Sequence, residues 1–266
     1  MTDVTGYTAA NKAAWDASAP AHEAGEEWQA LIAVIAQPGF SVLDATMTET
    51  LSGIGVQGAR AVQIGCNNGR ELLSLPALGA VPVLGIDQSE GFLMQARRLA
   101  HMAGSECRFV GADVYDLPED IPLGFDLAII TIGVLNWMPD LPRFLEIVAG
   151  LLAPGGRLVI YETHPVLEMF EPEGDAPFAA AHSYFREAPF EDDQAITYDG
   201  SDAGPAPSSY WFMHTMGAIV TGCAQAGLIV EQLTEYGHSN REVAYDIYEG
   251  HEPQLPMCFT LVARKS

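Results

Sequence analysis

Short apolar segments of strand length alternate with segments of helical length from residue 60 onward, and this alternation restricts the possible folds more than any other feature. The pattern predicts strands at 61–64, 82–86, 108–110, 125–131 and 157–161, and helices at 70–77, 91–103 and 141–152. The strand segments are nearly unbroken apolar runs, which is typical of parallel strands buried on both faces. The chain is therefore expected to have an α/β fold with a mostly parallel sheet flanked by helices.

The chain on either side of this region has a different pattern. Helices are predicted before it at 7–18, 23–36 and 41–51, and after it at 215–226. Two final strands, 228–234 and 257–263, have no helix between them, which indicates an antiparallel pair at the edge of the sheet.

Residues 165–213 are rich in proline, aromatic and acidic residues and fit no long periodic element. A connection of this length is expected to be a functional cover over a site. The expected organisation is a single domain made of an N-terminal helical segment, an α/β core, this insertion, and a C-terminal helix with two strands, at 1–58, 59–164, 165–213 and 214–266.

Charge and cysteine content exclude several classes of function. The 266 residues include 35 acidic and 12 basic ones, and the formal net charge of −23 repels nucleic acids and anionic membranes. No apolar run reaches the length of a membrane span and the N-terminus lacks a signal-peptide pattern, so a cytoplasmic protein is expected. The four cysteines are scattered along the chain, which argues against both a metal site and a disulfide framework.

A glycine-containing loop, QIGCNNG at Gln63–Gly69, joins the first strand of the core to the helix that follows. Gly65 and Gly69 allow the backbone to approach a ligand closely, and the N-terminus of a helix favours negative charge. The loop alone is a weak signal, because a tight turn without any ligand has the same composition.

Acidic residues follow the second and third strands. Asp87 ends the second strand about 20 residues beyond the loop, where an acid can accept both hydroxyls of a ribose. Asp113 can accept from an exocyclic amine, and the N–H of Val114 can donate to a ring nitrogen. Together with the loop they predict a nucleotide site, whereas an exposed acid and an acidic turn are the structural alternatives.

These motifs, in this order, resemble the class I S-adenosylmethionine-dependent methyltransferase family over about residues 11–263. The resemblance implies a Rossmann-like sheet of seven strands with the last one antiparallel. The cofactor it implies is S-adenosylmethionine, with S-adenosylhomocysteine as product. The run LLAPGGRLVI at 151–160 resembles the lead-in to the family's fifth strand, and 63–69 with 133–141 resemble a narrower subgroup.

The resemblance also implies roles for single residues. It assigns Asp87 to the ribose, Asp113 and Val114 to adenine, and Thr131 to the amino-acid end of the cofactor. Further cofactor contacts are expected from the lid helix, the loop and the residue after Asp87, namely Trp15, Gln63, Gly65, Cys66, Asn67, Gly69 and Gln88.

The loop departs from the family pattern at two positions. Gln63 replaces the usual acid, so an uncharged amide oxygen is expected near the methionine amine. Asn67 replaces the middle glycine, and asparagine tolerates a positive φ better than most residues. A nicotinamide site normally has G-x-G-x-x-G, which this loop lacks.

The acceptor is expected where open α/β sheets bind ligands, at the carboxyl ends of the fourth and fifth strands. Asn136 and Trp137 follow the fourth strand, and Tyr210 and Trp211 end the insertion, so these four are the candidate acceptor contacts. A role as an aromatic anchor is the alternative for the three aromatic residues.

Candidate catalytic residues are Glu162, His164 and His214. His164 is the candidate base and Glu162 its orienting group, while a structural pair at the strand end is the alternative. Methyl transfer from a sulfonium is an in-line displacement, so alignment and exclusion of water supply much of the acceleration. A base is needed only where the acceptor must lose a proton.

The leading hypothesis is methyl transfer from S-adenosylmethionine to a small-molecule acceptor. A cofactor-binding protein without catalysis is the first alternative, and a Rossmann-type oxidoreductase is the second. No nucleic acid, membrane or metal partner is expected, and the edge strands or the insertion would allow a homodimer.

Overall fold

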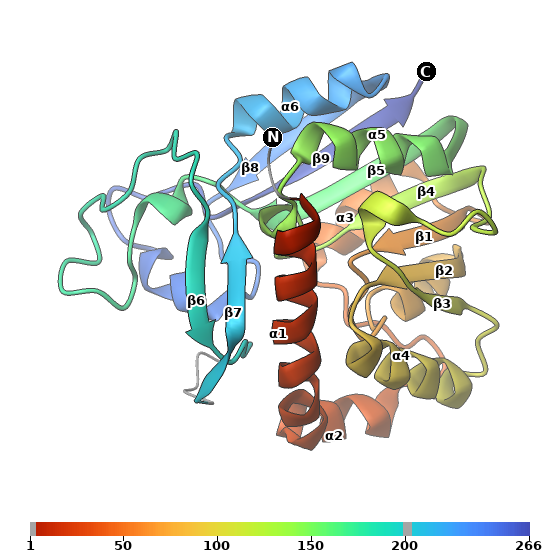
Figure 1. Ribbon diagram of the computed structural model, residues 1–266. Helices are drawn as coiled ribbons and strands as arrows, with labels where there is room; N and C mark the ends of the chain where they lie inside the picture. The colour runs from red at the N-terminus through yellow and green to blue at the C-terminus, as the bar shows by residue number, and fades with distance from the viewer. Residues whose placement is uncertain (1–3, 199–203) are drawn as a thin grey trace.

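A seven-stranded sheet forms the centre of the computed structural model, which describes residues 4–198 and 204–266 (Figure 1). Its strands are β1 (Arg60–Ile64), β2 (Val81–Asp87), β3 (Arg108–Gly111), β4 (Phe125–Ile130), β5 (Leu152–Thr163), β8 (Leu228–Tyr236) and β9 (Cys258–Lys265). Their spatial order is β3-β2-β1-β4-β5-β9-β8. The first five strands are parallel to one another, and β9 runs antiparallel to β5 and β8. The predicted sheet, with its last strand antiparallel, is confirmed.

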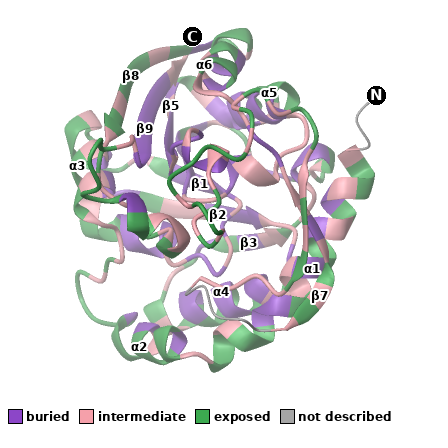
Figure 2. Cartoon of the chain, turned by 90° about the vertical axis from the view of Figure 1, so that its left-hand side faces the viewer, coloured by how far each residue is buried: buried purple, intermediate pink, exposed green. Residues whose placement is uncertain are grey.

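The apolar runs of the strands fill two separate cores, one on each face of the sheet. In β1, Val62 and Ile64 belong to one core and Ala61 to the other, because successive side chains of a strand point to opposite faces. Helices α5 (Leu141–Leu151) and α6 (Met216–Gln225) cover the first face. Helices α3 (Ala45–Ile54) and α4 (Glu90–Ala103) cover the second, so the strands are buried between them (Figure 2).

The N-terminal helix α1 (Val4–Ala24) lies between the core and a two-stranded antiparallel hairpin (Figure 1). The hairpin consists of β6 (Phe190–Gln194) and β7 (Pro205–Trp211). The buried Asn11 of α1 donates to the backbone oxygen of Tyr210 at 2.9 Å and accepts from its N–H at 2.7 Å. Helix α2 (Glu26–Val34) follows α1 after a break at Gly25.

Three local predictions were wrong. The helix predicted at 70–77 is a 3₁₀ helix, Leu72–Leu78, which contains Pro76 and ends at Gly79 with φ 79°. The third N-terminal helix, for which Ser41 was the predicted N-cap, begins three residues later than predicted, because the carboxylate of Asp44 caps it by accepting from Met47 N. The insertion, predicted to lack regular elements, contains the β6–β7 hairpin. None of the described helices is long and apolar enough to span a membrane.

Candidate functional site

The loop after β1 has three residues with positive φ: Gly65 at 65°, Asn67 at 50° and Gly69 at 74°. A Cβ atom on Gly65 would lie 2.7 Å from a methyl carbon of Val134, and one on Gly69 would lie 2.5 Å from the ring of Phe109. Both glycines are therefore required by conformation and by space, and they let the loop pass tightly between its neighbours.

Asp87, at the end of β2, fixes this loop. Its carboxylate accepts from the backbone N–H of Asn67 at 2.7 Å and from that of Ser89 at 2.9 Å. Burial raises the pKa of Asp87, while these N–H groups oppose the rise. Helix α1 reaches the same turn, since Asp16 accepts from the hydroxyl of Ser89 at 2.8 Å.

Gln63, one of the two residues that depart from the family pattern, has an unsatisfied polar atom. Its side chain is 1% exposed, and its Nε2 donates to the hydroxyl of Thr131 at 3.1 Å. Its Oε1 has no hydrogen-bond partner among the described residues. A buried acceptor without a partner is costly, so this oxygen fits a ligand that donates a hydrogen bond, such as the ammonium of the expected cofactor. The side chains that would hold the methionine end are therefore present.

Asp113 follows β3 and bonds to two parts of the chain. One carboxylate oxygen accepts from Tyr115 N at 2.9 Å, and the other accepts from the hydroxyl of Thr8 on α1 at 2.6 Å. A cavity of about 370 Å³ opens beside it, lined by Thr5, Thr8, Ala9, Lys12, Gln88, Glu90, Gly111, Ala112 and Asp113. Gln88 and Asp113, both predicted cofactor contacts, thus meet in one cavity, and the buried Val114 lies next to it in sequence.

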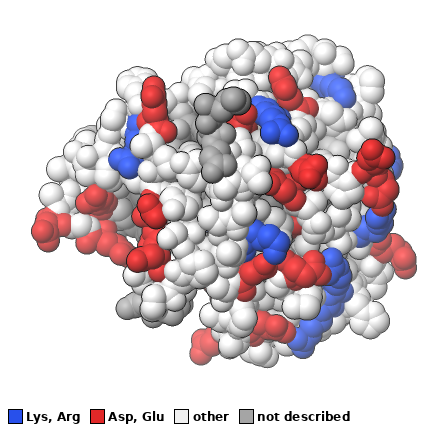
Figure 3. Space-filling model, in the orientation of Figure 1, with Lys and Arg blue, Asp and Glu red and all other residues white. Residues whose placement is uncertain are grey.

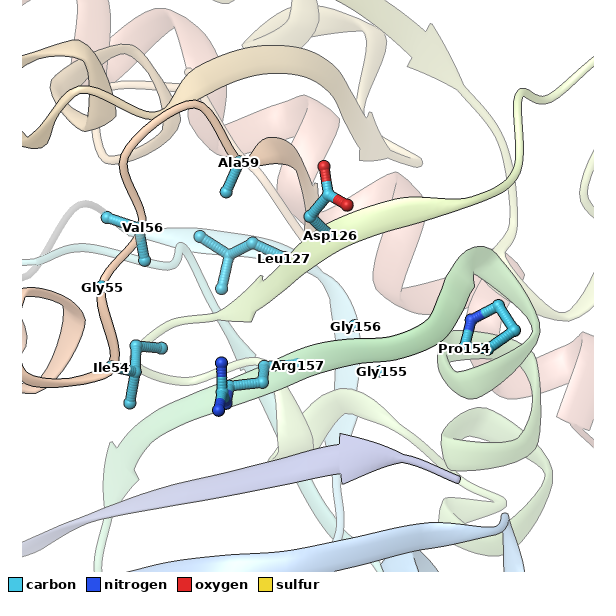
Figure 4. A pocket seen from close by; sticks show the side chains of 10 residues that line it. All are labelled: Ile54, Gly55, Val56, Ala59, Asp126, Leu127, Pro154, Gly155, Gly156 and Arg157. Carbon is cyan, nitrogen blue, oxygen red and sulfur yellow. The ribbon is translucent and has the colours of Figure 1, made fainter.

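A second cavity, of about 230 Å³, lies at the opposite edge of the sheet (Figure 4). Its lining comes from the end of α3, the segment before β1 and the amino ends of β4 and β5, and includes Asp126 and Arg157. No predicted site residue lines it. Ligands of parallel sheets bind at the carboxyl ends of strands, so this cavity is not the candidate site.

Trp15 of α1 lies between the cofactor residues and the predicted acceptor residues. Its ring makes edge contacts with Phe92, at 5.6 Å between centroids, and with Trp137, at 5.4 Å. Tyr198 lies 6.2 Å from it and faces the guanidinium of Arg70 at 5.6 Å. The buried Cys66 is a thiol rather than a thiolate, because burial raises its pKa well above the usual value.

Two of the four predicted acceptor contacts bind one carboxylate, that of Glu168, and a third packs against them. Asn136 Nδ2 donates to Glu168 at 2.8 Å and Trp211 Nε1 donates to it at 3.2 Å, while the rings of Trp137 and Trp211 lie 6.5 Å apart. Tyr210 is separate from this group, because its hydroxyl donates to Glu191 at the surface. Sequence reasoning missed Glu168, since nothing in the irregular insertion indicated which of its acids is buried.

The candidate catalytic residues have structural partners. Glu162, 2% exposed, accepts from the backbone N–H groups of Gly133 at 2.7 Å and Leu135 at 3.0 Å, and burial raises its pKa to about 8. His164 contacts Glu235 at 2.7 Å through Nε2 and accepts from Val166 N at 3.2 Å through Nδ1. Glu162 therefore supports the loop after β4, and the side-chain partner of His164 is Glu235 instead.

His214 also bonds to the backbone. Its Nε2 lies 2.8 Å from the oxygen of Met138, and burial lowers its pKa. The catalytic roles of Glu162, His164 and His214 stay predictions, and their geometry favours positioning. Among the described residues, no group of three or more acidic, histidine or cysteine side chains is arranged to hold a metal ion.

Comparison with known proteins agrees with this geometry. The family described as Methyltransferase domain matches residues 62–158. Trans-aconitate 2-methyltransferase of Methylobacterium nodulans is 36% identical over 129 residues, 46% of this chain and 47% of that protein. A tRNA U34 carboxymethyltransferase of Idiomarina loihiensis is 31% identical over 109 residues, 40% of this chain and 33% of that protein. The chain thus spans a third to a half of these relatives.

A solved structure extends the likeness to most of the chain. The S-adenosylmethionine dependent methyltransferase of Mesorhizobium loti has a TM-score of 0.54 and 22% identity, and the match covers 83% of this chain and 98% of that one. At this identity the likeness concerns the fold.

Proposed function

We propose that the chain, whose residues 62–158 match the Methyltransferase domain family, is a class I methyltransferase that transfers a methyl group from S-adenosylmethionine to a small-molecule acceptor and releases S-adenosylhomocysteine. The observation that carries the proposal is the buried, unpartnered Oε1 of Gln63 beside the loop that Asp87 holds in place. Among the described residues this atom lacks a donor, which a ligand would supply.

The bound cofactor supplies a methyl group already activated on a sulfonium. The residues of the chain bind the cofactor and orient it. Asp87 holds the loop and offers its remaining acceptor capacity to the ribose, Gln63 accepts from the methionine amine, and Asp113 and Val114 contact adenine. Residues 1–58 act as the lid and 165–213 as the acceptor cap, and together they exclude water.

A small acceptor is favoured over a polynucleotide by the net charge of −23. The four cysteines are free and buried, which supports a reducing cytoplasmic location. A homodimer stays a prediction, which the molar mass in solution would decide.

The test is calorimetric titration with S-adenosylhomocysteine. We expect binding in the micromolar range. In Asp87→Asn the affinity should fall by about tenfold or more, because one of the two backbone N–H groups that donate to Asp87 loses its acceptor. Asp116→Asn, at an exposed acid near the same edge, is the control and keeps the parent affinity.

Absence of binding at hundreds of micromolar would refute the proposal. Methylation of any acceptor in a metabolite screen with labelled cofactor would eliminate the alternative of a protein that binds the cofactor without catalysis.

A further inference from the structure

The N-terminal helix α1 forms one wall of the cavity beside Asp113. The opposite wall comes from the chain just after β2 and around the end of β3, whereas Thr5, Thr8, Ala9 and Lys12 line the cavity from α1. Thr5, Thr8 and Lys12 are three or four residues apart, so they lie on one face of the helix. The cavity therefore exists only while this face of α1 is docked.

The hydroxyl of Thr8 reaches across the cavity wall to Asp113. Thr8 is buried, and its Oγ1 lies 2.6 Å from a carboxylate oxygen of Asp113 and 3.3 Å from the backbone oxygen of Thr5. A hydroxyl has one proton to donate, and the shorter contact, to a charged group, is the stronger one. The other carboxylate oxygen accepts from Tyr115 N at 2.9 Å. One donor on each oxygen thus holds the carboxylate in a single orientation.

Asp113 still has acceptor capacity after these two bonds. An ionised carboxylate offers about four lone-pair sites, and the residue borders the cavity. A ligand that donates a hydrogen bond there meets a group whose orientation is already set, so little conformational freedom is lost on binding. The exocyclic amine of adenine is such a donor. The carbonyl oxygen that hypoxanthine has at the same position is an acceptor, and it would face the carboxylate with no proton between them.

Helix α1 is anchored on both sides of Thr8. Asn11 bonds to the backbone of Tyr210 on the hairpin. Asp16 accepts from the hydroxyl of Ser89 at 2.8 Å, eight residues and about 12 Å further along the helix. The helix is thus bonded to the turn after β2 and, through Thr8, to the turn after β3. These anchors fix the place from which the Thr8 hydroxyl acts.

The charged side chains at the rim of the cavity already have partners. Lys12 pairs with Asp16, and Glu90 pairs with Arg97. Basic and acidic side chains adjoin one another on this face of the molecule (Figure 3). Within the described part of the chain, Asp113 forms no ion pair. The cavity therefore suits a neutral base that donates a hydrogen bond better than it suits an anion.

We propose that Thr8 positions the carboxylate of Asp113 for the exocyclic amine of adenine, so that the N-terminal helix determines the preference of the cofactor site for adenine over hypoxanthine. This inference rests on the proposed function and adds a residue that sets the specificity of its cofactor site. Thr8 is a positioning residue, since it acts through Asp113. A purely structural role for Thr8 would instead affect both bases equally.

The test compares two ligands that differ only at this position of the base. The full chain is titrated calorimetrically with S-adenosylhomocysteine and with S-inosylhomocysteine, in which a carbonyl oxygen replaces the exocyclic amine. We expect the parent to bind the adenosyl ligand about a hundredfold more tightly, because a site built around a hydrogen-bond donor rejects a ligand that lacks it.

Thr8→Val keeps the shape of the side chain and removes its hydroxyl. We expect the ratio of the two affinities to fall about tenfold, because the adenosyl ligand loses a positioned acceptor while the inosyl ligand gains nothing from it. Thr8→Ala should give the same fall and serves as the second variant without a hydroxyl. Thr8→Ser retains the hydroxyl and should keep the ratio within about twofold of the parent. Thr50→Val is the matched control, since the Thr50 hydroxyl donates to the backbone of Thr46 within α3.

The ratio decides the outcome. If Thr8→Val and Thr8→Ala weaken both ligands by the same factor, or leave both unchanged, Thr8 does not set the specificity and the proposal is overturned. A parent protein that binds the two ligands equally overturns it as well. Thermal unfolding checks that each variant is folded. Failure of the parent to bind S-adenosylhomocysteine would instead refute the proposed function, so the two failures are distinguishable.

Discussion

The cofactor half and the acceptor half of the site are built by different kinds of contact. In the cofactor half, Asp87 and Asp113 each accept from backbone N–H groups, and most of these belong to turns that adjoin them in sequence. In the acceptor half, the contacts to Glu168 come from side chains 32 and 43 residues away. The first half is thus specified mainly by local turns, together with the contacts from Asn67 and Thr8, and the second by the docking of an insertion.

The two halves also treat negative charge differently. The backbone partners of Asp87 oppose the rise that burial causes in its pKa, whereas the pKa of the half-buried Glu242 is raised to about 7 by burial and by the negative charges of Glu168 and Asp246. Uncompensated charge lowers the stability of the folded state, and sites of function commonly retain such groups. The acceptor half is therefore expected to be the less stable of the two until a ligand binds.

The largest expected effect is in the cofactor half, at Gly69→Ala. The new Cβ would lie 2.5 Å from the ring of Phe109, at a backbone with φ 74°. We expect the free energy of unfolding to fall by about 3 kcal/mol, from strain and overpacking together. Chemical denaturation measures this loss.

Gly104→Ala separates the two causes. Gly104 has φ 64°, but a Cβ atom at this position would have no described neighbour within 4 Å, so its substitution costs only the strain, about 1 kcal/mol. Equal losses in the two variants would mean that the contact with Phe109 relaxes freely, and the loop would then not be the tightly specified half of the site.

The same contrast explains how much the sequence predicted. The alternating apolar runs predicted the strands of the sheet, and the place of β9 between β5 and β8 agrees with two final strands that have no helix between them. The hairpin was missed because β6 and β7 have the sequences FEDDQ and PAPSSYW, in which acids and prolines hide any strand pattern. Of the four predicted acceptor contacts, Asn136, Trp137 and Trp211 lie together and Tyr210 does not, and the buried acid that binds Asn136 and Trp211 depends on packing that no local signal encodes.

Asn11→Ala tests whether the lid and the insertion act as one unit. The side chain of Asn11 is fully buried, so its removal leaves the backbone N–H and the backbone oxygen of Tyr210 without their hydrogen-bond partner. We expect a loss of about 2 kcal/mol, confined to the β6–β7 hairpin. Hydrogen exchange should therefore speed up in β6 and β7 and stay unchanged in β1–β5.

Lys12→Ala is the matched control for Asn11→Ala. Its exposed side chain pairs with Asp16, one turn along α1, and surface pairs of this kind contribute little. Faster exchange throughout the sheet in Asn11→Ala would contradict the view that the hairpin docks separately onto α1.

The smallest expected effect is a gain of stability in the acceptor half, from Glu242→Gln. Burial and nearby negative charges raise the pKa of Glu242 from a usual 4.5 to about 7 in the folded protein. The folded state therefore keeps a proton that the unfolded state releases, and stability is lost as the pH rises from about 4.5 through about 7. Glutamine removes this loss, and we expect the variant to be more stable by about 1 kcal/mol at pH 8 and nearly equal to the parent at pH 4. Thermal unfolding at the two pH values measures the difference, with the exposed Glu173→Gln as a control that changes neither value. A gain of the same size at pH 4 would mean that the charge of Glu242 is already compensated, and the contrast between the two halves of the site would not hold.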